Sequence, residues 1–289
     1  MKLLILDAGH CLSLALMREA SRRADTELLI EDALTVETNH LAAVRPDAVI
    51  IPPLSQPANA EPAVVIAHAQ AVDQCLEACM ATQVPMVWCV SDQLYEDGSI
   101  EPINEDVIPS PRDESLQRLV KVGDRIREQC SRYLIVRLGP LFALEGTHGW
   151  LNELLDDLMA GREVPAERDV ILCPTSADAA AMALIGMLQQ QQCRADAWGA
   201  YHLAGTEPVS AYTFASMVRT QLATRLEGMG KLVELGPLKA LSHHHDQPLR
   251  RALNCRRVHD TFGVHQKPWQ LEMERMLDAW CLARTGETA

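Results

Sequence analysis

The sequence has few aromatic residues, no long apolar run and no paired cysteine motif. Phenylalanine, tyrosine and tryptophan together make up 4% of the 289 residues. No apolar run approaches the roughly 18 residues that span a bilayer, and no targeting segment stands at the start of the sequence. The nine cysteines form no C-x-x-C pair and fall mostly in apolar segments, so we expect buried, reduced thiols. We therefore expect a cytoplasmic protein with no membrane partner.

Basic residues are also in short supply. The chain has 26 Lys and Arg against 39 Asp and Glu, which gives a net charge of -13. A surface of this charge repels the phosphate backbone of a nucleic acid, so no nucleic-acid partner is expected. The charge does not exclude a local basic pocket for a phosphate group.

Short apolar segments alternate with longer amphipathic ones through the first half of the chain. Strands that are apolar at consecutive positions and separated by helices predict an α/β fold with a Rossmann-like, doubly wound parallel sheet. The predicted strands cover 2–7, 27–31, 47–51, 85–91 and 133–139, and the predicted helices cover 11–23, 38–44, 61–82 and 113–131.

The rhythm changes after Gly139, where the segments predict a smaller carboxyl-terminal lobe that covers the ligand crevice of the sheet. We assign residues 1–145 to the Rossmann-like domain and expect 168–204 to add a strand and a helix to it. Residues 146–167 and 205–289 form the predicted smaller lobe. Its last helix, about 268–284, is either a packing helix or part of a homodimer interface.

Six segments carry a family resemblance in their order and spacing. They read "RPDAVIIPP" at 45–53, "VPMVWCVSDQLYEDG" at 84–98, "YLIVRLGPLFA" at 133–143, "PTSADAAAMAL" at 174–184, "AYHLAGTEPVSAYTFASMV" at 200–218 and "PLRRALNCRRVHDTFGV" at 248–264. Together they resemble the extended short-chain dehydrogenases/reductases, and among them the dTDP-4-dehydrorhamnose reductases. The resemblance implies a fold that binds NADP or NAD and a substrate lobe that binds a nucleotide sugar.

The segment "ILDAGHCLSLALMREA" at 5–20 departs from the glycine-rich loop that the resemblance implies. Without gaps, the three glycines of G-x-x-G-x-x-G fall on Asp7, His10 and Ser13, and a shift of one residue recovers only Gly9. Gly9, His10 and Ser13 are therefore the remnant of a cofactor loop, and His10 is alternatively a plain helix-start residue. Without its glycines the loop loses its tight turn and its close approach to a pyrophosphate. We expect no cofactor, or NADP or NAD if the site is functional.

The helix after the serine turn departs from the family's Tyr-x-x-x-Lys motif. Counting back from the Gly-acidic pair at 123–124 places Leu116 at the tyrosine position and Val120 at the lysine position. The other register gives Gln117 and Lys121, which recovers a lysine but no phenol. Since neither register supplies the proton donor, hydride transfer by the family mechanism is not expected.

Three further residues are candidates for the site. Ser91 stands at the family's catalytic hydroxyl position, and it is alternatively a strand-end serine that closes a turn. Arg250 and Arg251 are candidates to bind the diphosphate of a nucleotide sugar, because arginine suits bidentate recognition of phosphate. The other interpretation of these arginines is a solvated face paired with carboxylates.

The histidine run His243, His244 and His245 suggests a metal site, with Asp246 or His259 as a further ligand. Adjacent histidines point in different directions on a regular backbone, so we expect no metal there and leave the role of this run open.

Three functions remain open from the sequence. The leading prediction is a pseudoenzyme, catalytically degenerate, that binds a nucleotide sugar or a protein partner in a regulatory role. The second is an active NAD(P)-dependent nucleotide-sugar reductase or epimerase with a remodelled site. The third is a structural or assembly protein without a small ligand.

Overall fold

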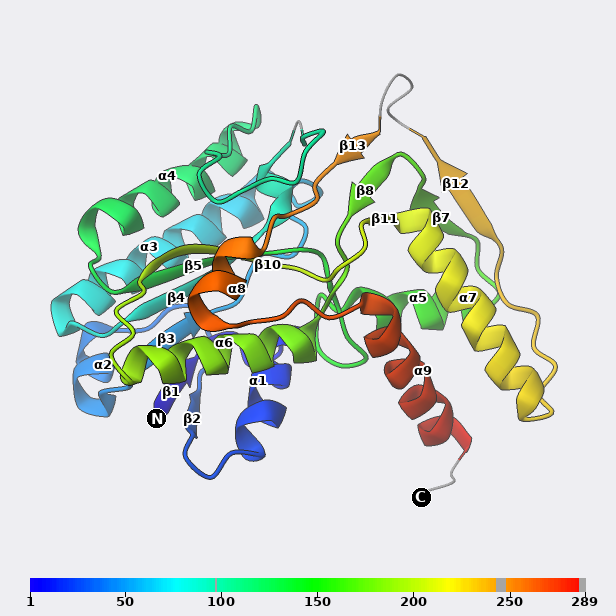
Figure 1. Cartoon of the computed structure of the whole chain (residues 1–289), viewed down its shortest axis with the longest axis horizontal. Helices are drawn as coiled ribbons and strands as arrows, with labels where there is room; N and C mark the ends of the chain where they lie inside the picture. Colours follow the sequence, from blue (N-terminus) through cyan, green and yellow to red (C-terminus); the bar gives the residue numbers. More distant parts are fainter. Residues whose placement is uncertain (97, 243–247, 286–289) are drawn as a thin grey trace.

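The large lobe is built on a six-stranded parallel sheet. The computed structural model describes residues 1–96, 98–242 and 248–285. The strands follow the order β10-β5-β4-β3-β1-β2 (Figure 1), so the chain reverses direction across the sheet between β1 and β3. They are β1 (Lys2–Ile5), β2 (Glu27–Ile30), β3 (Ala48–Ile51), β4 (Met86–Ser91), β5 (Tyr133–Leu138) and β10 (Gly199–Leu203).

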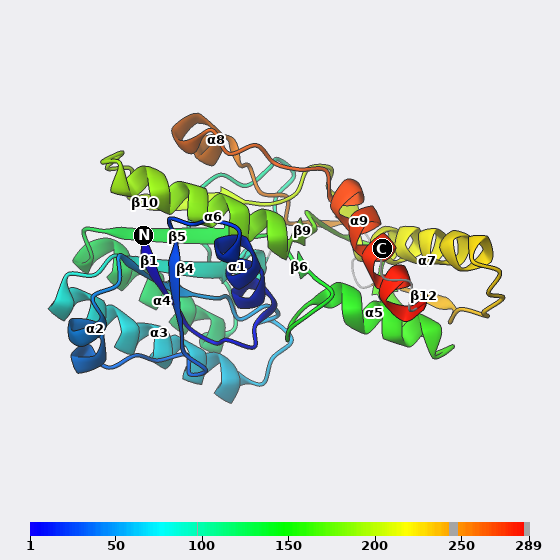
Figure 2. The ribbon, with the colours of Figure 1, turned by 90° about the horizontal axis from the view of Figure 1, so that it is seen from below.

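Helices cover both faces of this sheet, as the consecutive apolar positions of its strands require (Figure 2). One face carries α1 (Cys11–Ser21), α6 (Ala177–Gln192) and α8 (Arg256–Phe262). The other carries α2 (Thr38–Val44), α3 (Pro62–Thr82) and α4 (Glu114–Gln129). A separate apolar core therefore lies on each side of the strands.

The small lobe has its own core, in which Trp150 stacks on Phe214 with ring centroids 4.4 Å apart. Its helices are α5 (Trp150–Met159), α7 (Ala211–Gly228) and α9 (Trp269–Thr285). Its strands are β7 (Val164–Glu167), β8 (Val170–Leu172), β11 (Val209–Ser210), β12 (Leu238–Leu241) and β13 (Leu249–Arg250). The short pair β6 (Leu141–Phe142) and β9 (Thr175–Ser176) lies where the two lobes meet.

The predicted fold class is confirmed: the sheet is parallel and doubly wound, and a smaller lobe follows it. The short strands of the small lobe were not predicted, because runs of two to four residues carry too little periodicity. The residue boundaries predicted between the lobes stay a prediction. In the described residues, no helix combines the length and the apolar character needed to cross a membrane.

Candidate ligand-binding site

The loop after β1 makes its tight turn without a glycine. Asp7 occupies the first glycine position with a φ of 52°, a left-handed conformation that glycine adopts without cost. Its half-buried carboxyl group has a pKa raised by burial and partly lowered by nearby His148. The turn that a dinucleotide loop needs is therefore kept, but it now places a carboxylate beside the start of α1.

The first backbone donors of α1 are already bonded within the protein. The amide of Cys11 donates to the carbonyl of Thr147 at 3.0 Å, and the amide of Leu12 donates to Nδ1 of His10 at 3.0 Å. The amide of Thr147 in turn donates to the carbonyl of Gly9 at 2.8 Å. We call residues 145–148 the strap, because this segment crosses the loop and bonds to its backbone.

His10 and Ser13 fill the space that glycines leave open in a phosphate loop. His10 is fully buried, and its Nε2 lies 3.2 Å from the hydroxyl of Ser55. Burial lowers the pKa of His10 to about 3, so the ring is neutral at physiological pH. The buried hydroxyl of Ser13 donates to the carbonyl of Leu6 at 3.0 Å and ties the helix to the end of β1.

This loop does not fit the pyrophosphate of a dinucleotide. A helix start binds phosphate through free N–H groups and its positive end. Here the amides of Cys11 and Leu12 are bonded, the imidazole of His10 is neutral, and the carboxyl group of Asp7 stands alongside. We therefore derive no reaction step through a nicotinamide cofactor.

Ser91 ends β4 and closes the turn that follows it. Its hydroxyl accepts from the amide of Gln93 and donates to the carbonyl of Ser55, each at 3.3 Å. The structure thus gives this side chain the local bonds of a turn-closing serine, and the catalytic role assigned to it stays a prediction.

Asp92, the next residue, is the unusual group at this edge of the sheet. It is 1% exposed, and neither carboxylate oxygen makes a hydrogen bond of regular geometry. Burial raises its pKa to about 6, although the positive charge of Arg251 and the hydroxyl of Ser91 oppose the shift. Arg251, on the chain segment after β13, acts on this carboxyl group through its charge without a hydrogen bond of regular geometry, and its Nε is also buried without a partner.

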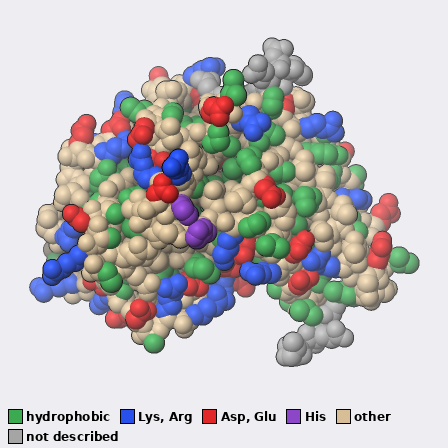
Figure 3. Space-filling view, viewed as in Figure 1, with side chains coloured by type: hydrophobic (Ala, Val, Ile, Leu, Met, Phe, Trp, Pro, Cys, Tyr) green, Lys and Arg blue, Asp and Glu red, His purple; other side chains and the backbone are tan. Residues whose placement is uncertain are grey.

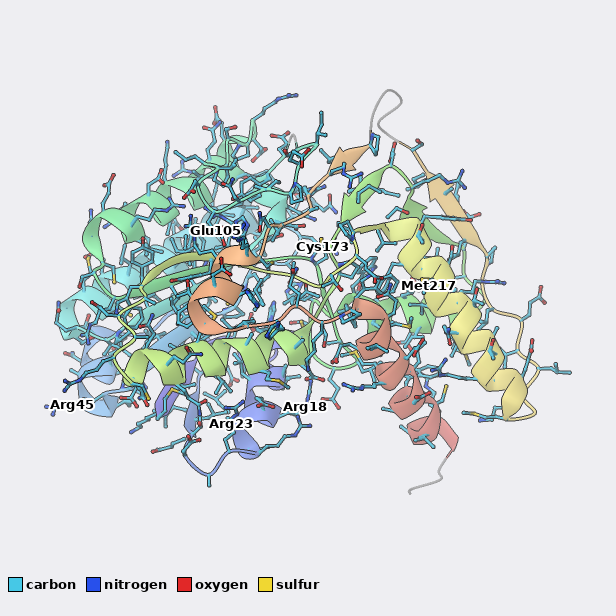
Figure 4. The ribbon with its side chains drawn as sticks, in the orientation of Figure 1. Arg18, Arg23, Arg45, Glu105, Cys173 and Met217 are labelled. Carbon is cyan, nitrogen blue, oxygen red and sulfur yellow. The ribbon has the colours of Figure 1, made fainter. Side chains whose placement is uncertain are left out.

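A cavity of about 560 Å³ opens along the segment that follows Arg251. Cys173, Ala252–Arg256 and Gly205–Pro208 line it, with His259 and His265 at its outer side. Figure 4 places Cys173 between Glu105 of the large lobe and Met217 of α7. Figure 3 shows histidine side chains at the surface over α8, with Lys or Arg and Asp or Glu side chains near them. The cavity is of ligand size, but Ser91, Arg250 and Arg251 are not among its lining residues, so the expected crevice with these residues in its walls stays a prediction.

The comparisons with known proteins agree with this architecture. The sequence profile described as the RmlD substrate binding domain matches residues 1–281. The chain belongs to the RmlD substrate binding domain family. No curated protein matches it.

Solved structures of this fold cover almost the whole chain. A dTDP-4-dehydrorhamnose reductase from Clostridium acetobutylicum is 15% identical, with a TM-score of 0.77 over 97% of this chain and 99% of that one. The Bacillus anthracis reductase in complex with NADP is 16% identical, with a TM-score of 0.74 over 96% and 99%. The Thermus thermophilus UDP-glucose 4-epimerase with NAD is 12% identical, with a TM-score of 0.71 over 96% and 98%. At these identities the likeness establishes the fold, which is that of the extended short-chain dehydrogenases/reductases.

The family resemblance places the Tyr-x-x-x-Lys motif on helix α4. In this chain, the side chains at both motif positions are apolar. Leu116 is 3% exposed and Val120 is half-buried, and both pack in the α3–α4 core. In the other register, Gln117 donates to the carbonyls of Pro111 and Arg112, and Lys121 is exposed. The absence of the catalytic pair stays a prediction from the sequence.

The two arginines predicted for the RmlD-type crevice lie differently. Arg251 is half-buried near Asp92, whereas Arg250 is exposed on β13. The neighbouring Arg256 and Arg257 pair with Asp260 and Asp106, so the solvated, paired interpretation describes those two. The contact of Arg250 and Arg251 with a diphosphate stays a prediction.

The sequence interpretation missed the strap and Asp92. The sequence marks the strap only by the glycines of "EGTHG" at 145–149. These glycines suggest a turn but do not indicate which loop the segment crosses. Residues 243–247, which include the histidine run and Asp246, lie outside the described residues. In the part of the chain that is described, no three His, Cys, Asp or Glu side chains are arranged to hold a metal ion.

Proposed function

We propose that this chain is a catalytically degenerate member of the RmlD family that binds a nucleotide sugar or a protein partner in a regulatory role. One observation carries the proposal: the amides that would hold a dinucleotide are bonded to the strap and to His10. A ligand that needs this loop would first have to displace bonds that the protein already makes.

The crevice between the lobes supports the ligand half of the proposal. The related reductases are named for dTDP-sugars and the epimerase for UDP-glucose, so nucleotide sugars are the ligand class of the fold. Arg251 directly precedes the Ala252–Arg256 wall of this cavity, and its buried Nε has no partner in the described chain. Guanidinium groups bind diphosphates through paired, charge-assisted hydrogen bonds. The proposed ligand would therefore place its diphosphate at Arg251.

Thermal unfolding tests the proposal. The protein is heated alone and with millimolar NADPH, NADH, or dTDP-, UDP- and GDP-sugars. A ligand at 100 times its Kd stabilises the folded state by about 2.7 kcal/mol, which raises the melting temperature by a few degrees. We expect a shift with a nucleotide sugar and none with either dinucleotide, and we expect Arg251→Gln to remove it. Arg118→Gln, which changes an exposed arginine of α4, is the matched control.

Two other results would redirect the assignment. A shift with NADPH or NADH would overturn the proposal in favour of an active oxidoreductase. That alternative has one observation behind it: Glu31 directly follows β2, where Rossmann proteins place the acidic residue that binds the ribose. No shift with any compound would overturn the nucleotide-sugar half and leave a protein partner as the ligand to identify.

A further inference from the structure

A separate cavity lies at the other edge of the sheet. It has a volume of about 650 Å³ and opens at the amino ends of β1, β3 and β4. Its walls come from the ends of α2, α3 and α6, together with Met1, Arg132 and Trp198. The crevice of the RmlD fold lies at the carboxyl ends of the strands, so the two cavities are separate. Figure 4 shows Arg45 at the outer end of the large lobe, well away from Cys173.

Two arginines give this amino-edge cavity its charge. Arg45 and Arg132 are both exposed, and neither makes an ion pair in the described chain. Each donates to one helix-end carbonyl, Arg45 to that of Ala42 and Arg132 to that of Gln83. Most N–H donors of both guanidinium groups therefore remain available. The one acidic side chain of the lining, Asp47, already accepts from the amide of Lys2 at 2.6 Å.

Helix ends alone would make this a poor site for an anion, because their last carbonyls are partly negative. The basic side chains counter that potential. Besides the two arginines, Nζ of Lys2 donates to the carbonyl of Val44 at the end of α2, at 3.1 Å. Each of these helix-end carbonyls is thus bonded to a cation, and two of the three cations, Arg45 and Arg132, line the cavity.

A buried amide and an indole complete the lining. Gln191 is 9% exposed, its Oε1 accepts from the amide of Ala197, and its Nε2 has no partner. A buried donor without an acceptor costs free energy, so an acceptor on a bound molecule would relieve that cost. The half-buried Trp198 adds an aromatic surface next to Met1.

From this combination we infer that the amino-edge cavity binds a small aromatic anion, of the size and chemistry of a nucleoside monophosphate. The phosphate would lie between Arg45 and Arg132, which offer the donors that a phosphate accepts. The base would lie over Trp198 and offer an acceptor to Gln191. The volume is within the range of small-molecule sites.

Calorimetric titration of the full chain with AMP and UMP tests the inference. We expect both to bind, and we expect Arg45→Gln and Arg132→Gln each to weaken binding about ten-fold or more, because each removes a charge-assisted contact. Arg132→Lys, which keeps the charge, should lose less. Adenosine and inorganic phosphate, each titrated alone, should bind more weakly than AMP. Both arginines are exposed, and circular dichroism confirms the fold of each variant.

Three results would overturn the inference. The first is no binding of AMP or UMP at millimolar concentration. The second is binding that both glutamine variants leave unchanged, since the arginines would then serve only the helix ends. The third is equal affinity for phosphate and AMP, which would show that the base does not contribute to binding. Arg251→Gln separates this site from the crevice, because it should leave AMP binding unchanged whatever it does to a nucleotide sugar.

Discussion

The two edges of the six-stranded sheet use their polar groups in opposite ways. At the carboxyl end of β1, the amides of Cys11 and Leu12 are bonded to the strap and to a neutral histidine. At the amino ends of the strands, Arg45 and Arg132 are held by one carbonyl each and keep unused donors. Parallel sheets of this type usually bind ligands at the carboxyl edge. In this chain the part of that edge nearest β1 is closed, and the amino edge is open.

The same fold thus holds its backbone donors in internal bonds at one edge and leaves side-chain donors available at the other. The phosphate loop keeps its left-handed turn at Asp7, and α1 still begins where a phosphate-binding helix would begin. The amides of Cys11 and Leu12 have acceptors within the protein. Side chains and the strap now supply the acceptors that a pyrophosphate would supply.

The largest effect that tests this comparison should come from acidification. His10, His68 and His202 have pKa values lowered by burial to about 3, 4 and 3. Below pH 6.5 these histidines bind protons in the unfolded chain but stay neutral in the folded chain. The free energy of unfolding therefore falls as the pH drops from 6.5 toward these pKa values. Each such histidine contributes up to about 1.4 kcal/mol per pH unit. Asp92, with its pKa raised to about 6, acts in the opposite direction between pH 6 and 3.8. The expected net loss is several kcal/mol.

Urea unfolding at pH 7, 6 and 5 measures this loss. In His10→Asn, which keeps a helix-capping side chain, the decline should be shallower by about 1.4 kcal/mol per pH unit. An unaltered slope in His10→Asn would mean that the closed edge does not hold its histidine neutral.

A smaller effect should follow from Gly146→Ala in the strap. A Cβ at this position would lie 2.7 Å from Cα of Cys11 and 2.9 Å from the carbonyl oxygen of Gly9. Since both are backbone atoms, the strap has to move, and we expect a loss of about 2–4 kcal/mol in urea unfolding. Gly161→Ala is the control, because Gly161 also has a positive φ but no atom within 4 Å. It should cost about 1 kcal/mol. Equal losses at the two sites would argue against a tight strap.

The smallest effect should come from Ser13→Gly, which restores the third glycine of the loop. It removes the bond from the hydroxyl to the carbonyl of Leu6 and places glycine inside a helix. We expect a loss of about 1–2 kcal/mol and no gain of NADPH binding, because the strap remains. Thermal unfolding with and without NADPH measures both. A shift with NADPH in this variant would show that the serine, and not the strap, closes the site.

Most of the fold could be predicted because its signals are local. The predicted 38–44 helix matches α2, and the predicted 61–82 helix begins one residue before α3. The apolar runs at 47–51 and 85–91 are strands because both of their faces are buried. In contrast, β12 pairs with β7, whose strand begins some seventy residues earlier, and no pattern within either segment records that pairing.

Features of the site could be predicted only where the identity of a single residue determines them. The loss of glycine at Asp7, His10 and Ser13 was readable, and the structure adds the bonds that replace them. The strap was not readable, since the bond between Gly9 and Thr147 depends on the packing of two lobes. The buried carboxyl group of Asp92 was missed for the same reason, because its environment comes from the segment that carries Arg251.

The bond between the strap and the first loop also bears on how the chain folds as it is synthesised. The side chain of Thr147 and the carbonyl of Gly9 are 138 residues apart in sequence, and Arg18 on α1 pairs with Asp178 across 160 residues. Contacts of such separation form late, because long stretches of chain have to be ordered first. The first strand and helix leave the ribosome early, but the start of the helix is completed only after Thr147 has also been synthesised. During that interval the amide of Cys11 lacks the acceptor that the strap provides, so we expect the start of α1 to stay incomplete until Thr147 has been synthesised.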